Sequence, residues 1–142
     1  MKKLLNLKFI VLSVFILLSF VLKVSAQTDD KVIGQYWSPE KNGKIEIYKV
    51  ANKYFGKFVW GSNPRKDTKN PKKELRTRDV VGMVFLTNFL FKDNEYVDGQ
   101  IYDPESGKTY SCKMWLDNGN LKVRGFVGFS FLGRTETFSK VQ

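Results

Sequence analysis

The segment from Gln100 to Lys113 constrains the fold of this chain most, because it predicts two β-strands joined by one tight turn. Pro104 presets the φ angle for the second position of such a turn, and Gly107 can adopt the positive φ with which the chain re-enters the sheet. Asp103 can accept backbone N–H bonds across the turn. A hairpin of this kind indicates an antiparallel sheet.

The returning strand separates its side chains into two faces, because successive residues of a strand point to opposite sides. We expect the core face to consist of Tyr110, Cys112, Met114 and Leu116. The outer face would consist of Thr109, Ser111, Lys113 and Trp115. Cys112 is the single cysteine of the sequence, so no disulfide can form within the chain. A nucleophilic cysteine needs a histidine or cationic neighbour, and Lys113 points the other way. We therefore interpret Cys112 as a buried thiol, with an intermolecular bridge as the alternative.

Apolar residues that alternate with a period of two recur along the chain and predict further strands. Turn signals such as Asn42-Gly43 separate most of these segments. We predict strands at Val32 to Trp37, Lys44 to Val50, Tyr54 to Trp60, Val81 to Phe91, Gln100 to Tyr102, Lys108 to Leu116, Leu121 to Val127 and Leu132 to Phe138. The segment from Val81 to Phe91 differs from the others because it is apolar on both faces. No stretch after residue 26 shows a sustained helical period.

The short connections favour an all-β fold in which about eight antiparallel strands follow one another as a meander. Closure into a small up-and-down barrel would remove the exposed edges of the sheet. Glycines within or beside the strands favour strong curvature, namely Gly34, Gly56, Gly99, Gly125 and Gly133. A barrel of this size has room for side chains or for one small ligand. A two-sheet β-sandwich is the alternative.

Residues 1–26 have the organisation of a secretory signal peptide. A basic start precedes an apolar run from Phe9 to Leu22, and Val24-Ser25-Ala26 offers small residues for cleavage. A membrane anchor is the alternative, but the run is shorter than the ~20 residues that span the hydrocarbon core. We predict cleavage near Ala26, a secreted or periplasmic protein, and one domain from residue 27 to residue 142.

The predicted connection from Gly61 to Asp79 is long and strongly basic, with Arg65, Lys66, Lys69, Lys72, Lys73, Arg76 and Arg78. The whole chain has a formal net charge of +10, of which residues 1–26 contribute four lysines and no acid, leaving +6. Long loops in compact domains are often functional. We predict that the first half is solvated and the second half ordered. The loop from Arg65 to Arg78 would then contact an anionic envelope lipid or glycan.

A further set of motifs runs in order along nearly all of the chain after residue 26: Gly34 near a tryptophan, Asn70-Pro71 followed by Leu75-Arg76-Thr77-Arg78, Gly82, the hairpin from Gly99 to Tyr110, Leu121 to Gly128, and Leu132-Gly133-Arg134-Thr135. This set resembles the bacterial secreted proteins grouped as domain of unknown function 2147. The chain departs from the usual family pattern at Lys72, where those proteins carry an acid, and at Phe138 and Lys140, where they carry Trp and Arg.

The resemblance implies a lipocalin-like, calycin-type barrel, because that family looks lipocalin-like in architecture. Gly34-Gln35-Tyr36-Trp37 is similar to the lipocalin Gly-x-Trp element. In lipocalins an arginine on the last strand stacks on the first-strand aromatic ring. The resemblance therefore assigns Arg134 to Tyr36 or Trp37 as a cation–π brace at the closed end of the barrel.

Composition excludes several kinds of catalysis. The chain has no histidine, which removes Ser-His-Asp and Cys-His catalysis and histidine metal sites. One cysteine cannot build a thiolate zinc cluster or a redox pair, and no phosphate loop of Walker or Rossmann spacing is present. We predict no metal and no cofactor, and we favour a non-catalytic protein. The alternative is an enzyme using arginine and carboxylate groups, which requires Asp98 or Asp103 to face Arg124 in a concave site.

The arginines are the best candidates for an anion site, because the guanidinium group offers a rigid fork to carboxylate or phosphate. We predict ligand contacts by Arg76, Arg78, Arg124, Arg134, Tyr36 and Tyr110. The alternative is that each arginine pairs with an acid such as Asp79, Glu74 or Glu136, or braces an aromatic ring.

We expect a binding module whose small barrel holds a hydrophobic or amphipathic ligand, with an anionic group as an option. The β meander, the aromatic content and the doubly apolar segment favour this hypothesis. The second hypothesis is a structural or partner-binding envelope protein, in which the apolar strand and the basic loop form a surface patch. Nucleic acid is not expected as a partner, because a secreted protein would meet anionic lipids or glycans instead. No oligomeric state is predicted.

Overall fold

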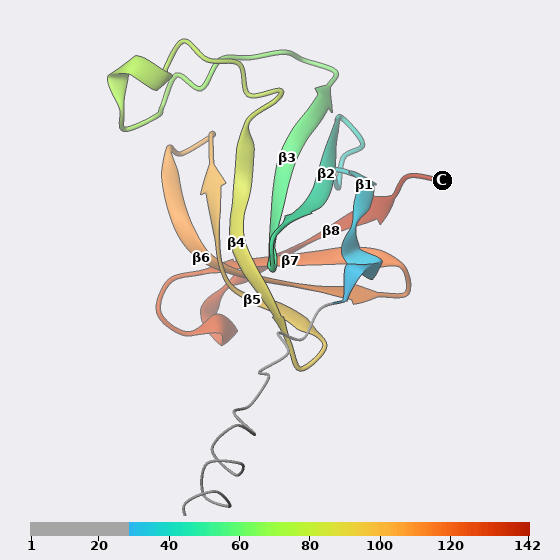
Figure 1. Ribbon diagram of the computed structural model, residues 1–142. Helices are drawn as coiled ribbons and strands as arrows, with labels where there is room; N and C mark the ends of the chain where they lie inside the picture. The colour runs from blue at the N-terminus through green and yellow to red at the C-terminus, as the bar shows by residue number, and fades with distance from the viewer. Residues whose placement is uncertain (1–28) are drawn as a thin grey trace, which may run out of the picture.

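The computed structural model describes residues 29–142, and the predicted signal peptide with its cleavage site near Ala26 lies outside these residues. Eight antiparallel strands follow one another around a closed barrel, and β8 pairs back onto β1 (Figure 1). The strands are β1 (Gly34–Trp37), β2 (Gly43–Val50), β3 (Lys53–Gly61), β4 (Val84–Lys92), β5 (Glu95–Asp103), β6 (Lys108–Asp117), β7 (Asn120–Phe126) and β8 (Arg134–Lys140). The predicted closed up-and-down barrel is confirmed, and the sandwich alternative is wrong.

Three short 3₁₀ helices accompany the strands: η1 (Asp30–Val32), η2 (Lys73–Leu75) and η3 (Ser130–Leu132). None was expected from the sequence, because a single turn leaves no periodic signal. No helix of residues 29–142 has the length and apolar character needed to cross a membrane.

The strand predictions are confirmed in number and order, with differences at their ends. β4 begins at Val84 and not at Val81. Gly82, with a φ of +92°, turns the chain there, and its amide donates to the carbonyl of Phe58 at 2.7 Å. β5 extends from Glu95 to Asp103, well beyond the predicted Gln100 to Tyr102. Polar residues on its outer face hide this longer strand from a pattern of apolar alternation.

The β5–β6 hairpin has the predicted turn. Gly107 has a φ of +72°, and its amide donates to the backbone carbonyl of Asp103 at 2.8 Å. The Asp103 side chain accepts from the amide of Glu105 at 2.9 Å. On β6, Cys112 and Met114 are buried as predicted. Burial raises the pKa of the Cys112 thiol to about 12.

Aromatic and aliphatic side chains fill the barrel interior, and two glycines make room for them. A Cβ atom added to Gly56 would lie 2.8 Å from Cδ1 of Leu86, and one added to Gly99 would overlap the ring of Phe89. These large side chains therefore pack directly against the backbone of the neighbouring strand. Toward the end of the barrel where β3 meets β4, Phe58 and Phe85 stack with ring centroids 4.0 Å apart.

Three buried tyrosines close the end of the barrel at which β1 begins. The hydroxyl of Tyr36 donates to the carbonyl of Val32 at 2.8 Å, that of Tyr54 to the Asp30 carboxylate at 2.9 Å, and that of Tyr96 to the carbonyl of Asp29 at 2.5 Å. Asp29 and η1 are thereby held across this end. Burial raises the pKa of Tyr36, so its hydroxyl remains a neutral donor.

The predicted brace between Arg134 and Tyr36 or Trp37 is wrong. β8 runs from Arg134 to Lys140, and its last residue, not its first, lies opposite Tyr36. Arg134 is therefore near the other end of the barrel, beside Glu136 at 3.4 Å. The cation over the Trp37 ring is the ammonium of Lys44, 4.2 Å from the ring centroid.

Candidate functional site

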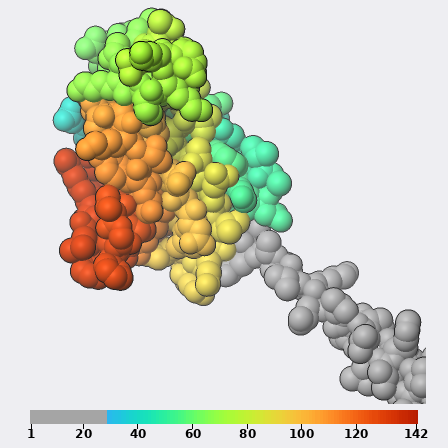
Figure 2. Space-filling model, turned by 90° about the vertical axis from the view of Figure 1, so that its left-hand side faces the viewer, coloured from blue at the N-terminus to red at the C-terminus, as the bar shows by residue number. Residues whose placement is uncertain are grey.

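The two ends of the barrel are built differently. The closed end carries η1 and the short β2–β3, β4–β5 and β6–β7 turns. The opposite end, which we call the open end, carries the β1–β2, β3–β4, β5–β6 and β7–β8 connections. The β3–β4 connection (green) and the β7–β8 connection (red) project on one face of the molecule, with the orange surface of β6 between them (Figure 2). The candidate site is built at this open end.

Asp67 anchors the β3–β4 connection, residues 62–83, to the barrel. Its fully buried carboxylate accepts hydrogen bonds from Tyr102 Oη at 2.6 Å, Asn70 Nδ2 at 2.8 Å and Arg78 Nε at 3.0 Å. Because Tyr102 belongs to β5, one buried acid holds both limbs of the connection on the barrel. The prediction that the first half of this connection is solvated is wrong at Asp67 and Asn70, which are both buried.

The electrostatics of this cluster favour the charged form of the acid. Burial opposes ionisation of Asp67, but hydrogen bonds from Tyr102, Asn70 and Arg78, with the charge of Arg78, outweigh it and lower the pKa of its carboxyl group. Burial, followed by the bond to Asp67, raises the pKa of the Tyr102 hydroxyl. At neutral pH the ionised Asp67 carboxylate therefore accepts the hydrogen bond that the neutral Tyr102 hydroxyl donates.

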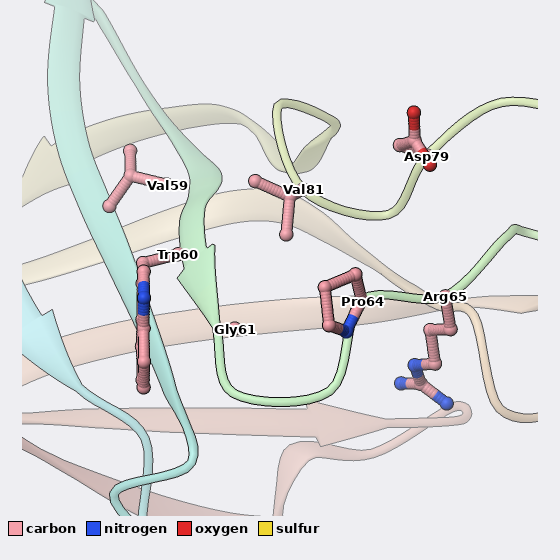
Figure 3. A pocket seen from close by; sticks show the side chains of 7 residues that line it. All are labelled: Val59, Trp60, Gly61, Pro64, Arg65, Asp79 and Val81. Carbon is pink, nitrogen blue, oxygen red and sulfur yellow. The ribbon is translucent and has the colours of Figure 1, made fainter.

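A pocket of about 460 Å³ lies where the anchored connection returns past β3 (Figure 3). This volume falls within the roughly 300–1,000 Å³ that is usual for small-ligand sites. Its lining comes from the last residues of β3 and from both limbs of the connection: Val59, Trp60, Gly61, Pro64, Arg65, Asp79 and Val81. In Figure 3, Val81 and Pro64 point toward one another across the space, and Trp60 borders it from β3.

The walls of this pocket are mainly apolar, and its charged groups lie at the rim. Arg65 forms an ion pair with Glu105 of the β5–β6 turn, and Asp79 pairs with Lys66 at 2.7 Å. Figure 3 shows the Arg65 guanidinium directed away from Asp79. The backbone amide of Val80 donates to the carbonyl of Arg65 at 3.0 Å, so the two limbs are also joined through their main chains. The pocket can accept an apolar body with a polar or charged end.

The four arginines predicted to bind a ligand fall into two separate pairs. Arg76 and Arg78 lie in the β3–β4 connection, where Arg76 Nε donates to the carbonyl of Asn70 at 2.7 Å and Arg78 binds Asp67. Arg124 lies on β7 and Arg134 at the start of β8, near the β7–β8 connection. The structure does not bring the pairs together. Arg78 and Arg134 each face an acid, which agrees with the alternative reading of these residues.

The remaining candidates also occupy different places. Tyr36 is buried at the closed end, and Tyr110 is half-buried on the interior face of β6. Arg124 donates to the carbonyls of Ser130 and Phe131 and to the hydroxyl of Thr135, whereas Asp103 caps its own turn. Asp98 is exposed on β5. The facing of Arg124 with Asp103 or Asp98 that the enzyme alternative requires is therefore not formed within residues 29–142.

Sequence reasoning missed Asp67 and Trp60, the two residues that most define this site. Asp67 stands among basic and polar residues and carries no local signal of burial. The sequence places Trp60 at the end of a strand, but the residues beside it, such as Pro64 and Val81, belong to the β3–β4 connection, whose path the sequence does not show. A tryptophan next to a long basic loop at a strand end was the one available indication, because exposed aromatic side chains often mark binding surfaces.

One comparison with known proteins shows the family, and another shows the fold. A family model described as "Uncharacterized protein conserved in bacteria (DUF2147)" matches residues 34–140. The solved structure of protein HP1028 from Helicobacter pylori, which is described as belonging to the lipocalin family, is similar with a TM-score of 0.71. It is 23% identical in sequence, and the match covers 78% of this chain and 83% of that chain. No curated protein matches the sequence.

Proposed function

This chain belongs to the DUF2147 family of bacterial proteins, and we propose that it is a non-catalytic binding module for a small amphipathic ligand. The lipocalin-like barrel supports this proposal, because the mouths of β-barrels are among the preferred places for small-ligand sites. The observation that carries it is the pocket beside Trp60 and Val81, with apolar walls and a charged rim.

Side chains fill the interior of the barrel, which favours a ligand site at the open end. Side chains such as Phe89 and Leu86 occupy the space up to the backbone of adjacent strands. Within residues 29–142, every buried side-chain nitrogen and oxygen has a hydrogen-bond partner. The deep interior thus offers a ligand no free polar group with which to be oriented, whereas Arg65 and Asp79 at the pocket hold exposed ion pairs that a ligand group can replace.

Arg65 would select an anionic end of the ligand. Its partner Glu105 is 68% exposed, and surface ion pairs contribute little to stability. A ligand carboxylate or phosphate can therefore replace Glu105 at small cost, while its apolar part lies against Val81 and Pro64.

Native mass spectrometry of the protein from the cells that produce it tests the proposal. We expect an adduct of small mass. We also expect added dodecanoate to bind and to change the tryptophan fluorescence of the protein, because Trp60 borders the pocket. Dodecanol, which has the same chain and no charge, should bind more weakly. Absence of an adduct together with absence of dodecanoate binding would contradict the proposal.

Two matched substitutions place the site. Val81→Lys puts a charge into the apolar wall, and Val84→Lys puts the same charge on β4 outside the lining; the two valines are 37% and 40% exposed. Val81→Lys should abolish dodecanoate binding, and Val84→Lys should leave it unchanged. Equal binding by the two variants would exclude this pocket.

The secretory signal remains part of the proposal: the protein would act in the periplasm or outside the cell after cleavage near Ala26. The basic start, the apolar run and the small residues of positions 1–26 support it. The intact mass of protein from a periplasmic or culture fraction should correspond to a chain that begins near Gln27. A full-length mass in the cytoplasmic fraction would contradict it.

The basic connection favours a second candidate function, contact with an anionic envelope lipid or glycan. Lys69, Lys72 and Lys73 are exposed, and no ion pair involves them within residues 29–142. Replacing Lys66, Lys69, Lys72 and Lys73 by Gln should abolish association with envelope extracts. Association that persists in this variant would count against a structural or partner-binding role of the connection.

A further inference from the structure

The β7–β8 connection, residues 127–133, carries a concentrated apolar surface. Val127, Phe129, Phe131 and Leu132 are each 68–73% exposed, and the rings of Phe129 and Phe131 stack with centroids 5.5 Å apart. The other exposed large apolar residues of the described chain reach at most 57%, at Val50, and are spread over several elements. Contiguous apolar patches on a protein surface mark interaction sites. We call residues 127–132 the apolar tip.

Three consecutive carbonyl groups of the apolar tip, those of residues 129–131, are hydrogen-bonded although the large apolar side chains of the tip are exposed. The carbonyl of Phe129 accepts from the amide of Leu132 at 3.1 Å. The guanidinium of Arg124 on β7 donates from Nε to the carbonyl of Ser130 at 2.6 Å and from Nη2 to the carbonyl of Phe131 at 3.0 Å. Three consecutive carbonyl groups are therefore satisfied within the protein and do not depend on water.

This combination fits a lipid bilayer. A backbone polar group without a partner is strongly unfavourable in hydrocarbon, so an irregular loop can reach only the boundary of the headgroups, and each carbonyl satisfied within the protein lowers the cost of that contact. The red part of the surface in Figure 2, which contains this connection together with β8, is convex and shows no groove. A projecting apolar end needs no shape-matched partner to become buried in the boundary between headgroups and acyl chains.

Charge beside the tip indicates anionic lipids. Arg134 lies two residues after the tip, and its side chain is 87% exposed, with Glu136 as a partner at 3.4 Å. The basic β3–β4 connection lies on the same face of the molecule (Figure 2). Basic residues next to an inserted apolar segment are attracted to anionic headgroups, and the attraction weakens with salt.

We propose that the apolar tip inserts into the surface of a bilayer containing anionic lipids, with Arg134 at the level of the phosphate groups and Arg124 holding the tip backbone in its inserted form. This site is separate from the pocket beside Trp60. A failure to bind dodecanoate would therefore not contradict membrane insertion of the apolar tip.

Co-sedimentation with vesicles tests the proposal. The folded wild-type protein should bind vesicles of phosphatidylcholine with phosphatidylglycerol, and should bind pure phosphatidylcholine vesicles less. Phe129→Ser with Phe131→Ser should reduce the binding by more than about tenfold, because two aromatic side chains no longer leave water. The matched control, Val50→Ser with Leu90→Ser, removes two other exposed apolar residues and should bind like wild type. Dodecanoate binding should be unchanged in both variants.

Arg124→Lys adds a test of the ordered backbone. Lysine keeps the charge but cannot reach both carbonyls with a rigid fork, so vesicle binding should fall while circular dichroism shows a folded barrel. Absence of wild-type binding to anionic vesicles would overturn the proposal. So would equal losses in the tip variant and its control, or a protein dimer in ultracentrifugation that the tip variant abolishes, because the tip would then cover a second copy of the chain.

Discussion

Tyr102 on β5 donates its hydroxyl hydrogen to Asp67 across 2.6 Å, and this bond joins the barrel to the long connection that forms the pocket. Asn70 Nδ2 lies 3.2 Å from the same hydroxyl. The pocket wall thus depends on a polar cluster outside the apolar core. Disturbing that cluster should loosen the connection before it unfolds the barrel.

Tyr102→Phe should lower the free energy of unfolding by about 2 kcal/mol, because it removes a hydrogen bond to a buried charge. Hydrogen exchange should rise in residues 62–83 more than in the strands. Tyr110→Phe is the matched control: Tyr110 is half-buried on the neighbouring strand, and its hydroxyl makes no hydrogen bond within residues 29–142. Exchange that rises equally in both variants would contradict the anchoring role.

The cluster should also be sensitive to acid. The pKa of Asp67 is lower in the folded protein than its ordinary value of 3.8. Its stabilising contribution is therefore complete above that value and is lost as the pH falls through the lower folded-state pKa. Wild type should exceed Asp67→Asn in stability toward urea at pH 7, and the difference should shrink below about pH 4. A difference that does not change with pH would show that the charge of Asp67 is not what stabilises the connection.

Gly107→Ala should be far more destabilising than Gly119→Ala. Both glycines have a positive φ, of +72° and +79°, which costs an L-residue about 1 kcal/mol. A Cβ atom at Gly107 would also overlap the backbone carbonyl of Lys69, whereas nothing lies within 4 Å of one at Gly119. We expect a loss of about 1 kcal/mol at Gly119 and at least about 3 kcal/mol at Gly107, by urea denaturation. Similar losses at both positions would mean that the connection does not pack on the hairpin.

The barrel could be predicted because period-two alternation is a local signal. Ile45 and Ile47 on β2 and Cys112 and Met114 on β6 are buried as their spacing predicts, and the turn at Gly107 follows from its own residues. Short connections then leave antiparallel neighbours as the economical arrangement.

The placement of Arg134 could not be predicted, because it depends on where β8 starts. The sequence predicts that start at Leu132, but the chain forms η3 there. A Cβ atom on Gly133 would overlap the carbonyl of Gly125, so the chain returns against β7 at this glycine and β8 begins one residue later. Register then sets Lys140, not Arg134, opposite Tyr36.

The site at the open end was hidden for a similar reason. Asp67 becomes buried through Tyr102 and Arg78, which lie 35 and 11 residues away in the chain. In the apolar tip, the sequence places Val127 at the end of one strand and Leu132 at the start of the next, with residues 128–131 between them. Apolar alternation identifies strands but does not show which apolar side chains of a connection remain exposed.

Cys112 is 1% exposed, and burial raises the pKa of its thiol to about 12. The thiolate is the reactive form, so the folded protein should not react with Ellman's reagent at pH 8 over minutes. Labelling should become complete in urea, at a rate that follows the opening of the barrel.

Removal of the tip phenylalanines should leave this rate of Cys112 labelling unchanged, because the tip is outside the core. Tyr96→Phe removes the bond to the carbonyl of Asp29 that helps close the barrel, so it should accelerate labelling in moderate urea. Rapid labelling of the folded wild type would show that β6 opens independently of the barrel.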